Sequence, residues 1–283
     1  MLRSLNSGVS GLRAFQTKLD VIGNNIANVN TTGFKKSRVV FEDLFSQTIK
    51  NATAATEISG GVNPLQIGIG TNVASVDQLF SPGSPTTTNN VNDLYLDGDG
   101  FFVVQNGSGT QYLTRAGNFS LDSLNHLVNP DGMLVMDTSD PQEPIIIPAD
   151  AVTYSIDSNG IITGVNALGE RILGVDANGN SVTDPNAQYN PIKIAIATVD
   201  NPNGLKKLGG SLYTTTTNSG DVEIPNRNGI TNTQIITGAL EMSNVDLAEE
   251  MTDMITAQRG FQANSKIITT SDMILDELIN LKR

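Results

Sequence analysis

The eleven prolines of this 283-residue chain are confined to its middle, between Pro64 and Pro225. The first 63 residues and the last 58 contain none. Proline interrupts helices because it lacks a backbone N–H and clashes with the preceding turn. The two ends can therefore form long helices, whereas the middle favours strands and turns. This change in composition predicts domain boundaries near both ends of the chain.

The N-terminal segment carries hydrophobic residues at heptad spacing. One series repeats every seven residues, and a second series lies three residues further on, which is the a/d pattern of helices that pack along one another. The turn sequence Asn30-Thr31-Thr32-Gly33 predicts that this helix ends near Asn28. The first series is Leu5, Leu12, Leu19 and Ile26, and the second is Gly8, Phe15, Ile22 and Val29.

The C-terminal segment has a longer repeat of the same kind. Ser243 and Asp246 have the spacing of a capping box, with Asp in place of the usual Glu, and they predict where the helix begins. The main series is Leu247, Met254, Phe261, Ile268 and Leu275, and the mixed companion series is Met251, Ala257, Asn264, Ser271 and Leu278.

The two helical segments carry opposite charge. Residues 1–28 contain three basic residues and one acidic residue, whereas residues 241–281 contain two basic and eight acidic residues. Opposite charges beside apolar series favour helices that pair with each other. A helix pair without a further core is marginal in water, so we expect it to order fully only where neighbouring copies bury its remaining faces. An ordinary surface helix docked on a globular core is the alternative.

The middle of the chain predicts β structure. Short apolar runs between residues 94 and 199 alternate with turn signals such as Asn106-Gly107 and Asn159-Gly160, at intervals typical of an all-β barrel or sandwich. The expected fold class is therefore α+β, with discontinuous N- and C-terminal helices pairing in a coiled-coil-like inner domain. The expected boundaries are 1–30 and 241–283 for the helical domain, 31–75 and 233–240 for an extended linker, and 76–232 for a central all-β domain.

Candidate catalytic and metal chemistry is weak. The chain has no cysteine and one histidine, His126, so zinc and thiol sites are not expected. Asp97-Gly98-Asp99-Gly100 resembles the start of a calcium loop, but the later acidic ligand is missing and a hairpin turn is the better prediction. The short cluster Lys35-Lys36-Ser37-Arg38 is expected to be a solvated or subunit-facing patch. We expect no enzyme activity and no cofactor.

Charge and hydropathy exclude further classes. A net charge of −12 argues against nucleic-acid binding, which needs a basic face. The chain has no run of about 18 apolar residues, so we expect no membrane insertion. Its first 25 residues lack the apolar core of a cleaved signal peptide, so any export is expected to use another route.

Five segments together resemble a known family. The N-terminal stretch from Leu19 to Lys36, LDVIGNNIANVNTTGFKK, is similar to the signature of bacterial flagellar rod and hook axial proteins. The C-terminal stretches SNVD at 243–246 and AQRGFQANSK at 257–266 resemble the other end of these proteins. The internal stretches LDGDGFF at 96–102 and YLTRAGNF at 112–119 also match. The resemblance covers essentially the whole chain.

This resemblance implies an architecture and a location. Both termini form helices of an inner tube, the β domain lies outside it, and the subunit passes unfolded through the flagellar type III export apparatus before it polymerises helically. The implied partners are further copies of the chain and the adjacent rod, hook-cap and hook–filament junction proteins. The expected assembly interface comprises Leu5, Leu12, Phe15, Leu19, Ile22, Asn24, Asn25, Ile26, Asn28, Val29, Asn30, Gly33 and Phe34, with Leu247, Met251, Met254, Phe261, Asn264, Ile268, Leu275 and Leu278.

Two members of the family fit the chain. The distal rod protein has the same short form, with linker residues that resemble 41–49 and 65–68 of this chain. Compact hook proteins of bacilli share that linker and also resemble residues 259–262 and 266–272, so we favour the hook, which transmits torque from rod to filament as a universal joint. An extracellular β-rich adhesin or phage-tail-like fibre subunit is the alternative from another class. It explains the Thr/Asn/Gly-rich middle but not the heptad series at both ends.

Overall fold

The computed structural model describes residues 2–54, 60–139, 142–175, 181–184, 189–224 and 233–281. It divides into two compact units, each assembled from stretches that are distant in sequence. Unit 1 comprises Met1–Ala27, Lys36–Leu79 and Val245–Arg283, and unit 2 comprises Asn28–Lys35 and Phe80–Asn244. Helices at both ends and strands between them confirm the α+β fold class.

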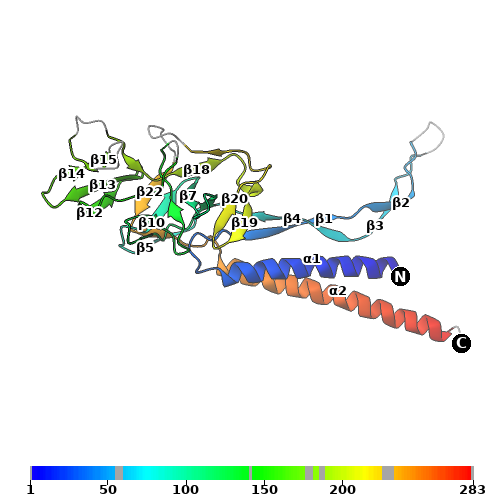
Figure 1. Cartoon of the computed structure of the whole chain (residues 1–283). Coiled ribbons are helices and arrows are strands. Elements are labelled where there is room, and N and C mark those ends of the chain that lie inside the picture. The colour runs from blue at the N-terminus through cyan, green and yellow to red at the C-terminus, as the bar shows by residue number, and fades with distance from the viewer. Residues whose placement is uncertain are drawn as a thin grey trace. The chain divides into compact units, whose positions relative to one another are not determined.

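Unit 1 is built on an antiparallel pair of helices, α1 (Leu2–Ala27) and α2 (Leu247–Leu281), shown in blue and orange to red in Figure 1. Asn25 near the end of α1 meets Glu250 near the start of α2. Towards the other end, Gly8 faces Ile268. The helix predicted to end near Asn28 ends at Ala27.

The start of α2 is fixed by Asp246. Its Oδ1 atom accepts hydrogen bonds from the backbone N–H groups of Ala248, at 2.8 Å, and Glu249, at 3.3 Å. These donors have no partner within the helix, so an N-cap carboxylate stabilises the helix end. Glu249 and Glu250 add negative charge to the first turn, where the helix dipole favours it.

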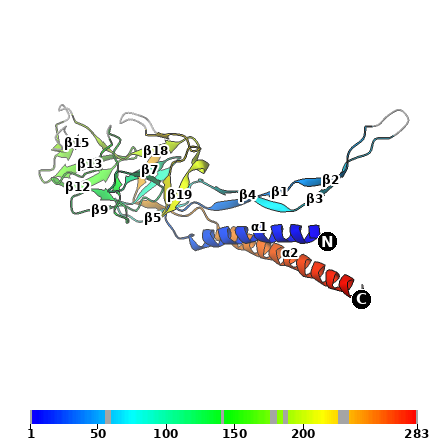
Figure 2. The ribbon, with the colours of Figure 1, turned by 45° about the vertical axis from the view of Figure 1, so that its right-hand side comes forward.

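Two antiparallel ribbons complete unit 1 (Figure 2). Strand β1 (Ser37–Asp43) pairs with β4 (Thr71–Gln78), with a register shift between Val40 and Phe41. Strand β2 (Ser46–Lys50) pairs with β3 (Leu65–Gly68). The sequence analysis expected an extended linker here. The structure instead pairs β2 with β3, and the connection over residues 51–64 is too long to be predicted as a two-residue hairpin turn.

Unit 2 contains a large antiparallel sheet in the order β19-β20-β8-β7-β11-β10-β9, with β18 pairing both β7 and β21. Strand β7 lies at its centre, because it pairs with β8, β11 and β18. The strands are β7 (Phe101–Gln105), β8 (Gln111–Thr114), β9 (Ser120–Leu121), β10 (Leu127–Val128), β11 (Leu134–Val135), β18 (Ile196–Val199), β19 (Lys206–Gly209), β20 (Leu212–Thr214) and β21 (Val222–Glu223).

Smaller sheets surround this one within unit 2. One has the order β12-β13-β14, and β17 also pairs with β13, at Ile161 and Ile162. Three two-stranded ribbons pair β5 with β23, β6 with β22 and β15 with β16. Their bounds are β5 (Pro85–Thr87), β6 (Leu94–Asp97), β12 (Ala151–Ile156), β13 (Ile161–Asn166), β14 (Arg171–Ile172), β15 (Gly174–Val175), β16 (Ser181–Val182), β17 (Ile192–Lys193), β22 (Gln234–Thr237) and β23 (Ala239–Glu241); a 3-10 turn spans Pro202–Gly204.

The predicted linker at 233–240 differs from the structure. The stretch 233–240, expected to be an extended linker, supplies most of strands β22 and β23 of unit 2. Ile235 and Ala239 are buried there and hold the strands in register. The predicted end of the all-β domain at residue 232 lies outside the described residues.

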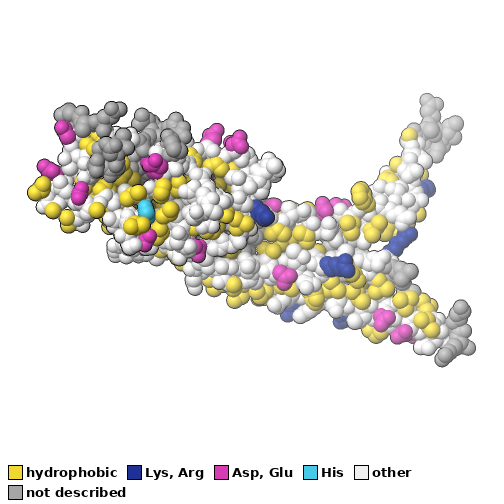
Figure 3. All heavy atoms as spheres, viewed as in Figure 1, with side chains coloured by type: hydrophobic (Ala, Val, Ile, Leu, Met, Phe, Trp, Pro, Cys, Tyr) yellow, Lys and Arg dark blue, Asp and Glu magenta, His cyan; other side chains and the backbone are white. Residues whose placement is uncertain are grey.

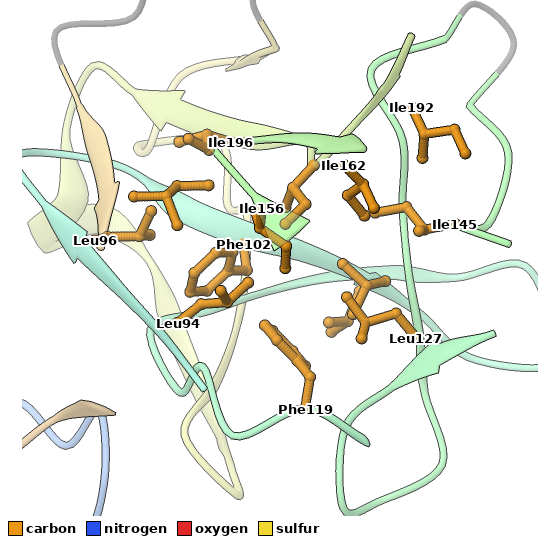
Figure 4. Packing of buried hydrophobic residues seen from close by; sticks show 14 of the residues in the cluster. Leu94, Leu96, Phe102, Phe119, Leu127, Ile145, Ile156, Ile162, Ile192 and Ile196 are labelled. Atoms are coloured by element: carbon orange, nitrogen blue, oxygen red, sulfur yellow. The ribbon is translucent and has the colours of Figure 1, made fainter. Parts of the chain in front are cut away.

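The core of unit 2 is apolar and aromatic (Figure 4). Phe102 and Phe119 meet edge to face, with ring centroids 5.2 Å apart, in the centre of the larger buried cluster. A second cluster on the other side of β7 contains Phe101, Leu113 and Tyr213. Alternate residues of β7 thus enter different clusters, as the period of two of a strand requires.

Candidate assembly interface

The described residues contain no constellation that resembles a metal or catalytic centre. No group of three or more His, Asp and Glu side chains converges among them. Asp97 and Asp99 are exposed and lie at the turn between β6 and β7. None of the helices that the structure describes combines the length and apolar character needed to cross a bilayer. The features that suggest function are the helix pair and its exposed faces.

The helix pair packs closely because small residues of one helix face larger side chains of the other. Gly8 and Gly11 of α1 lie against Ile268 and Asn264, and a Cβ atom at Gly11 would come within 2.8 Å of the Asn264 side chain. On α2, a Cβ atom at Gly260 would lie 2.6 Å from the Phe15 ring. Gly260 therefore provides the space that the Phe15 ring occupies, at the expense of some helix propensity.

Opposite charges connect the elements of unit 1. Lys18 Nζ lies 3.0 Å from Asp253 Oδ2 across the helix pair, and Lys36 Nζ lies 2.9 Å from Glu249 Oε2. Both pairs line a cavity of about 360 Å³ beside β1. Because its cations and carboxylates bond to each other, this cavity does not point to a particular ligand.

Asn25 joins three segments of unit 1. Its side-chain amide donates to the Ser37 carbonyl oxygen at 2.9 Å and to Glu250 Oε2 at 3.1 Å, and its Oδ1 atom accepts from the Ser37 N–H at 3.0 Å. Asn25 and Glu250 are both buried. This amide therefore ties the end of α1 to the start of β1 and to the first turn of α2.

Glu250 is a residue that the sequence analysis missed. It stands seven residues before Ala257 and occupies the heptad position that was assigned to Met251, whereas Met251 is 47% exposed. An acidic residue in the first turn of a helix is normally explained by the helix dipole. The signal that could have found it is its heptad spacing from Ala257, Asn264 and Ser271.

The remaining predicted interface residues fall into three groups by burial. Asn28 Oδ1 accepts a hydrogen bond from Thr31 Oγ1 at 3.1 Å, in the turn that follows α1. The half-buried residues are Leu5, Leu12, Phe15, Leu19, Ile26, Asn28, Val29, Met254, Phe261, Asn264, Ile268 and Leu275. The exposed ones are Asn24, Asn30, Leu247, Met251 and Leu278, and Ile22, Asn25, Gly33 and Phe34 are buried.

Gly33 and Phe34 belong to unit 2 and follow α1 in the chain. Gly33 has φ +66°, and a Cβ atom there would lie 2.6 Å from the backbone nitrogen of Ala116, so no other residue fits without strain. Its N–H donates to the Glu241 carbonyl oxygen at 2.8 Å. The Phe34 ring is buried beneath Lys207 Nζ, which lies 4.0 Å from the ring centroid.

A buried ionic cluster of Lys35, Glu241 and Arg115, the Glu241 cluster, lies beside Gly33. Lys35 Nζ is 2.6 Å from Glu241 Oε1, and the side-chain exposures are 0% and 1%. Arg115 Nη1 is 3.7 Å from Glu241 Oε2, and the Arg115 guanidinium lies over the Phe101 ring. Lys35 was expected on a solvated or subunit-facing patch. That expectation is wrong, because Glu241, 206 residues later in the chain, compensates its charge in the interior.

Burial shifts the titration of this cluster. Desolvation lowers the pKa of Lys35, and Glu241 opposes part of that effect. Desolvation also lowers the pKa of Arg115. Burial raises the pKa of nearby Tyr213 to about 12. The hydroxyl of Tyr213 has no hydrogen-bond partner among the described residues.

Hydrophobic side chains remain exposed over much of unit 1, as yellow patches on the helices and ribbons show (Figure 3). Phe45 is 92% exposed, and β2 and β3 are exposed at every position. Exposed contiguous apolar surface of this kind marks an interaction site. The exposed residues of the ribbons are Phe41, Phe45, Ile49, Val62, Leu65, Ile67, Ile69 and Val76, and those of the helices are Val9, Leu247, Met251, Ile255, Ile267, Met273, Ile274, Leu278, Ile279 and Leu281.

Three protein families match separate parts of the chain. Residues 5–35 match the family described as flagella basal body rod protein. Residues 95–164 match the D1 domain of the flagellar hook protein FlgE/F/G. Residues 236–281 match the C-terminal region of the flagellar basal body rod FlgEFG proteins.

Full-length relatives agree. The flagellar basal-body rod protein FlgG of Bacillus subtilis is 50% identical over 284 residues, with 100% of both chains covered. FlgG of Borreliella burgdorferi is 38% identical over 288 residues, again with 100% of both chains covered. The flagellar hook protein FlgE of the same organism is 32% identical over 442 residues, with 100% of both chains covered.

A helix pair made from both chain ends, a β-rich region between them in sequence and these full-length matches define an axial structural protein of the bacterial flagellum. Within that class, the chain belongs to the FlgE/F/G family of rod and hook proteins.

Proposed function

We propose that this chain is the subunit of the distal rod, the drive shaft of the flagellar basal body, and that its copies assemble into a helical homopolymer. The observation that carries the proposal is the full-length match to rod proteins of nearly the same length. The hook match runs over 442 positions, so at least 159 of them face gaps in this chain of 283 residues. A hook subunit of that kind contains a large region that this chain lacks.

The sequence analysis favoured the hook because residues 259–262 and 266–272 resemble compact hook proteins. Those residues lie on one helix and amount to eleven positions, whereas the similarity to rod proteins extends over both helices, the ribbons and unit 2. The rod is therefore the better supported of the two functions.

The ribbon of β2 and β3 supports an assembled state. Two isolated antiparallel strands are marginally stable in water, and this ribbon exposes its apolar side chains on both faces. Packing against further copies would bury Phe45, Ile49 and Leu65. A subunit that contacts its neighbours through such an arm, as well as through its helices, suits a stiff shaft better than a joint whose subunits slide.

The proposed partners and route follow from this role. The subunit would be exported by the flagellar apparatus without a cleaved signal peptide and would join the rod below it and the hook above it. A repeated head-to-tail contact that does not close on itself generates a filament. The predicted interface residues on α1 and α2 are the proposed contacts within that filament.

Electron microscopy of basal bodies from a strain that lacks the gene tests the proposal. Truncated rods without hooks are the expected result, with full-length rods restored by the gene on a plasmid. Complete rods that end without a hook would overturn the proposal in favour of the hook. Normal flagella would refute both the rod and the hook function and would leave the adhesin or fibre subunit as the remaining alternative.

A further inference from the structure

The outer face of α1 carries a short apolar stripe beside one cation. Leu5, Val9 and Leu12 have the i, i+4, i+7 spacing that places them on one face of a helix. Val9 is exposed, and the two leucines are half-buried. Arg13 lies four residues after Val9, is exposed, and forms no ion pair with a described residue. We call these four residues the α1 stripe.

The C-terminal turns of α2 carry the complementary arrangement. Ile274, Leu278 and Leu281 also have the i, i+4, i+7 spacing, and they are 44%, 48% and 78% exposed. Glu277 precedes Leu278, is exposed, and has no ion-pair partner in the part of the chain that the structure describes. We call these residues the α2 stripe. In both ribbon views, the end of α2 runs past α1 and away from it (Figures 1 and 2).

Val9 and Leu278, the middle residues of the two stripes, cannot meet within one chain. Gly8 lies against Ile268 in the antiparallel pair, and Leu278 is ten residues further along α2. At 1.5 Å per residue, this places Leu278 at least about 15 Å from Val9. A contact between Val9 and Leu278 must therefore join two copies.

We propose that the α2 stripe of one copy covers the α1 stripe of the next copy, with Arg13 paired to Glu277. The inference rests on the proposed function and specifies one contact of that assembly. Each stripe has three apolar residues at the same spacing. The charge beside one stripe, Arg13, is opposite in sign to the charge beside the other, Glu277, so the two surfaces match in apolar spacing and in charge. Charge complementarity of this kind selects partner and register.

Disulfide cross-linking tests the contact directly, because the chain contains no cysteine. The full-length variant Val9→Cys/Leu278→Cys is expressed in the bacterium that makes the protein, in place of the wild-type chain. Basal bodies are then isolated and oxidised. Since a disulfide needs Cα atoms within about 7 Å, a cross-link reports contact between copies. The expected product is a dimer at twice the 30.0 kDa of the chain, extending to a ladder of higher multiples.

Matched controls make the result specific. Either cysteine alone should give no ladder. Asp20→Cys/Leu278→Cys places the first cysteine on the same outer face of α1, eleven residues or about 16 Å from Val9, and should not cross-link. Arg13→Glu and Glu277→Arg, each added to the cysteine pair, should reduce the dimer at least about tenfold, and the double reversal should restore it. Arg3→Glu and Asp272→Arg are exposed reversals off the stripes and should leave the dimer unchanged.

The outcomes separate this contact from the proposed function. If the cysteine variant is present in basal bodies but gives no dimer, the contact is refuted and the rod assignment stands. If the dimer forms but both single charge reversals leave it unchanged, the Arg13–Glu277 pair is refuted. If wild-type protein is absent from purified basal bodies by immunoblot, the proposed function fails and this inference fails with it.

Discussion

Glu241→Gln is expected to destabilise unit 2 by about 3–5 kcal/mol, because it leaves two cations in the interior without their counter-ion. Gln keeps the shape of the side chain and an oxygen that can accept from Lys35 and from the Gly83 N–H, which now bond to Glu241 Oε1 at 2.6 and 2.9 Å. The substitution therefore removes the negative charge with little change in packing. Arg115 and Lys35 then face each other with side-chain exposures of 2% and 0%.

Deprotonation of Lys35 sets an upper limit on the loss of stability in the Glu241→Gln variant. If the variant releases the Lys35 proton on folding, holding the amine neutral at pH 7 costs about 1.4 kcal/mol for each unit below the ordinary pKa of about 10.4. The limit is therefore about 4.6 kcal/mol, which agrees with the range for a broken buried ion pair. Arg115 offers no such release, since guanidinium groups stay protonated.

The free energy of unfolding of the Glu241→Gln variant should also depend on pH. Where the folded Lys35 is neutral and the unfolded Lys35 is charged, the unfolded chain binds more protons, so stability rises with pH. For Glu241→Gln the slope should approach about 1.4 kcal/mol per pH unit between the lowered pKa and about 10.4. In the wild type the pKa of Lys35 is lowered less, because Glu241 stabilises its charged form, so the slope begins at higher pH.

Urea unfolding of the full chain, followed by far-ultraviolet circular dichroism at pH 7 and pH 9, measures both quantities. Glu223→Gln on the exposed face of β21 is the matched control and should change stability by less than about 0.5 kcal/mol. Glu241→Gln/Lys35→Met should recover much of the loss. A loss below about 1 kcal/mol in the single variant, or a loss that does not shrink at pH 9, would refute the reasoning.

Three further substitutions test other contacts. Gly260→Ala gains helix propensity but drives a methyl group into the Phe15 ring, so it should lower the thermal midpoint with a net loss of about 1–3 kcal/mol, and Phe15→Leu in the same chain should relieve it. Asn25→Ala should cost about 1–3 kcal/mol and speed hydrogen exchange at the Ser37 amide, which loses its acceptor. Tyr213→Phe should be nearly neutral at pH 7, because the hydroxyl is unpaired. At pH 11 the wild type should be less stable than this variant by about 1.4 kcal/mol, since the unfolded tyrosine ionises near pH 10 and the folded one at about 12; equal urea midpoints at pH 11 would contradict this.

The helices were the part of the fold most accessible from sequence. Heptad spacing located Phe15, Ile22 and Ile268, and the turn sequence that follows predicted the end of α1 within one residue of Ala27. Local periodicity suffices there because each helix carries its own repeat. The same pattern could not tell which of two adjacent series accompanies Gly8 against the partner helix, so Leu12 was given the position that Gly11 occupies.

Long-range pairing explains what the sequence did not reveal. Strand β1 ends at Asp43 and β4 begins at Thr71, so the two partners are far apart in sequence and no local pattern identifies the pairing. Lys35 belongs to a basic cluster whose composition is typical of a surface patch. Its burial depends on the ion pair with Glu241, which lies far along the chain. Buried polar contacts such as Asn25 with Glu250 depend on geometry that no local pattern encodes.

The closure of unit 1 by both chain ends has a consequence for the order of folding. The residues that meet at Asn25 and Glu250 are separated by 225 positions, so α1 has no partner helix until nearly the whole chain is available. Contacts of such high sequence separation form late, after the loop between them has been closed. Neighbouring strands of unit 2 such as β7 and β8 pair over short separations and have no such constraint. A chain that breaks off before α2 therefore lacks the helix pair and the exposed apolar residues that α2 contributes to the candidate interface.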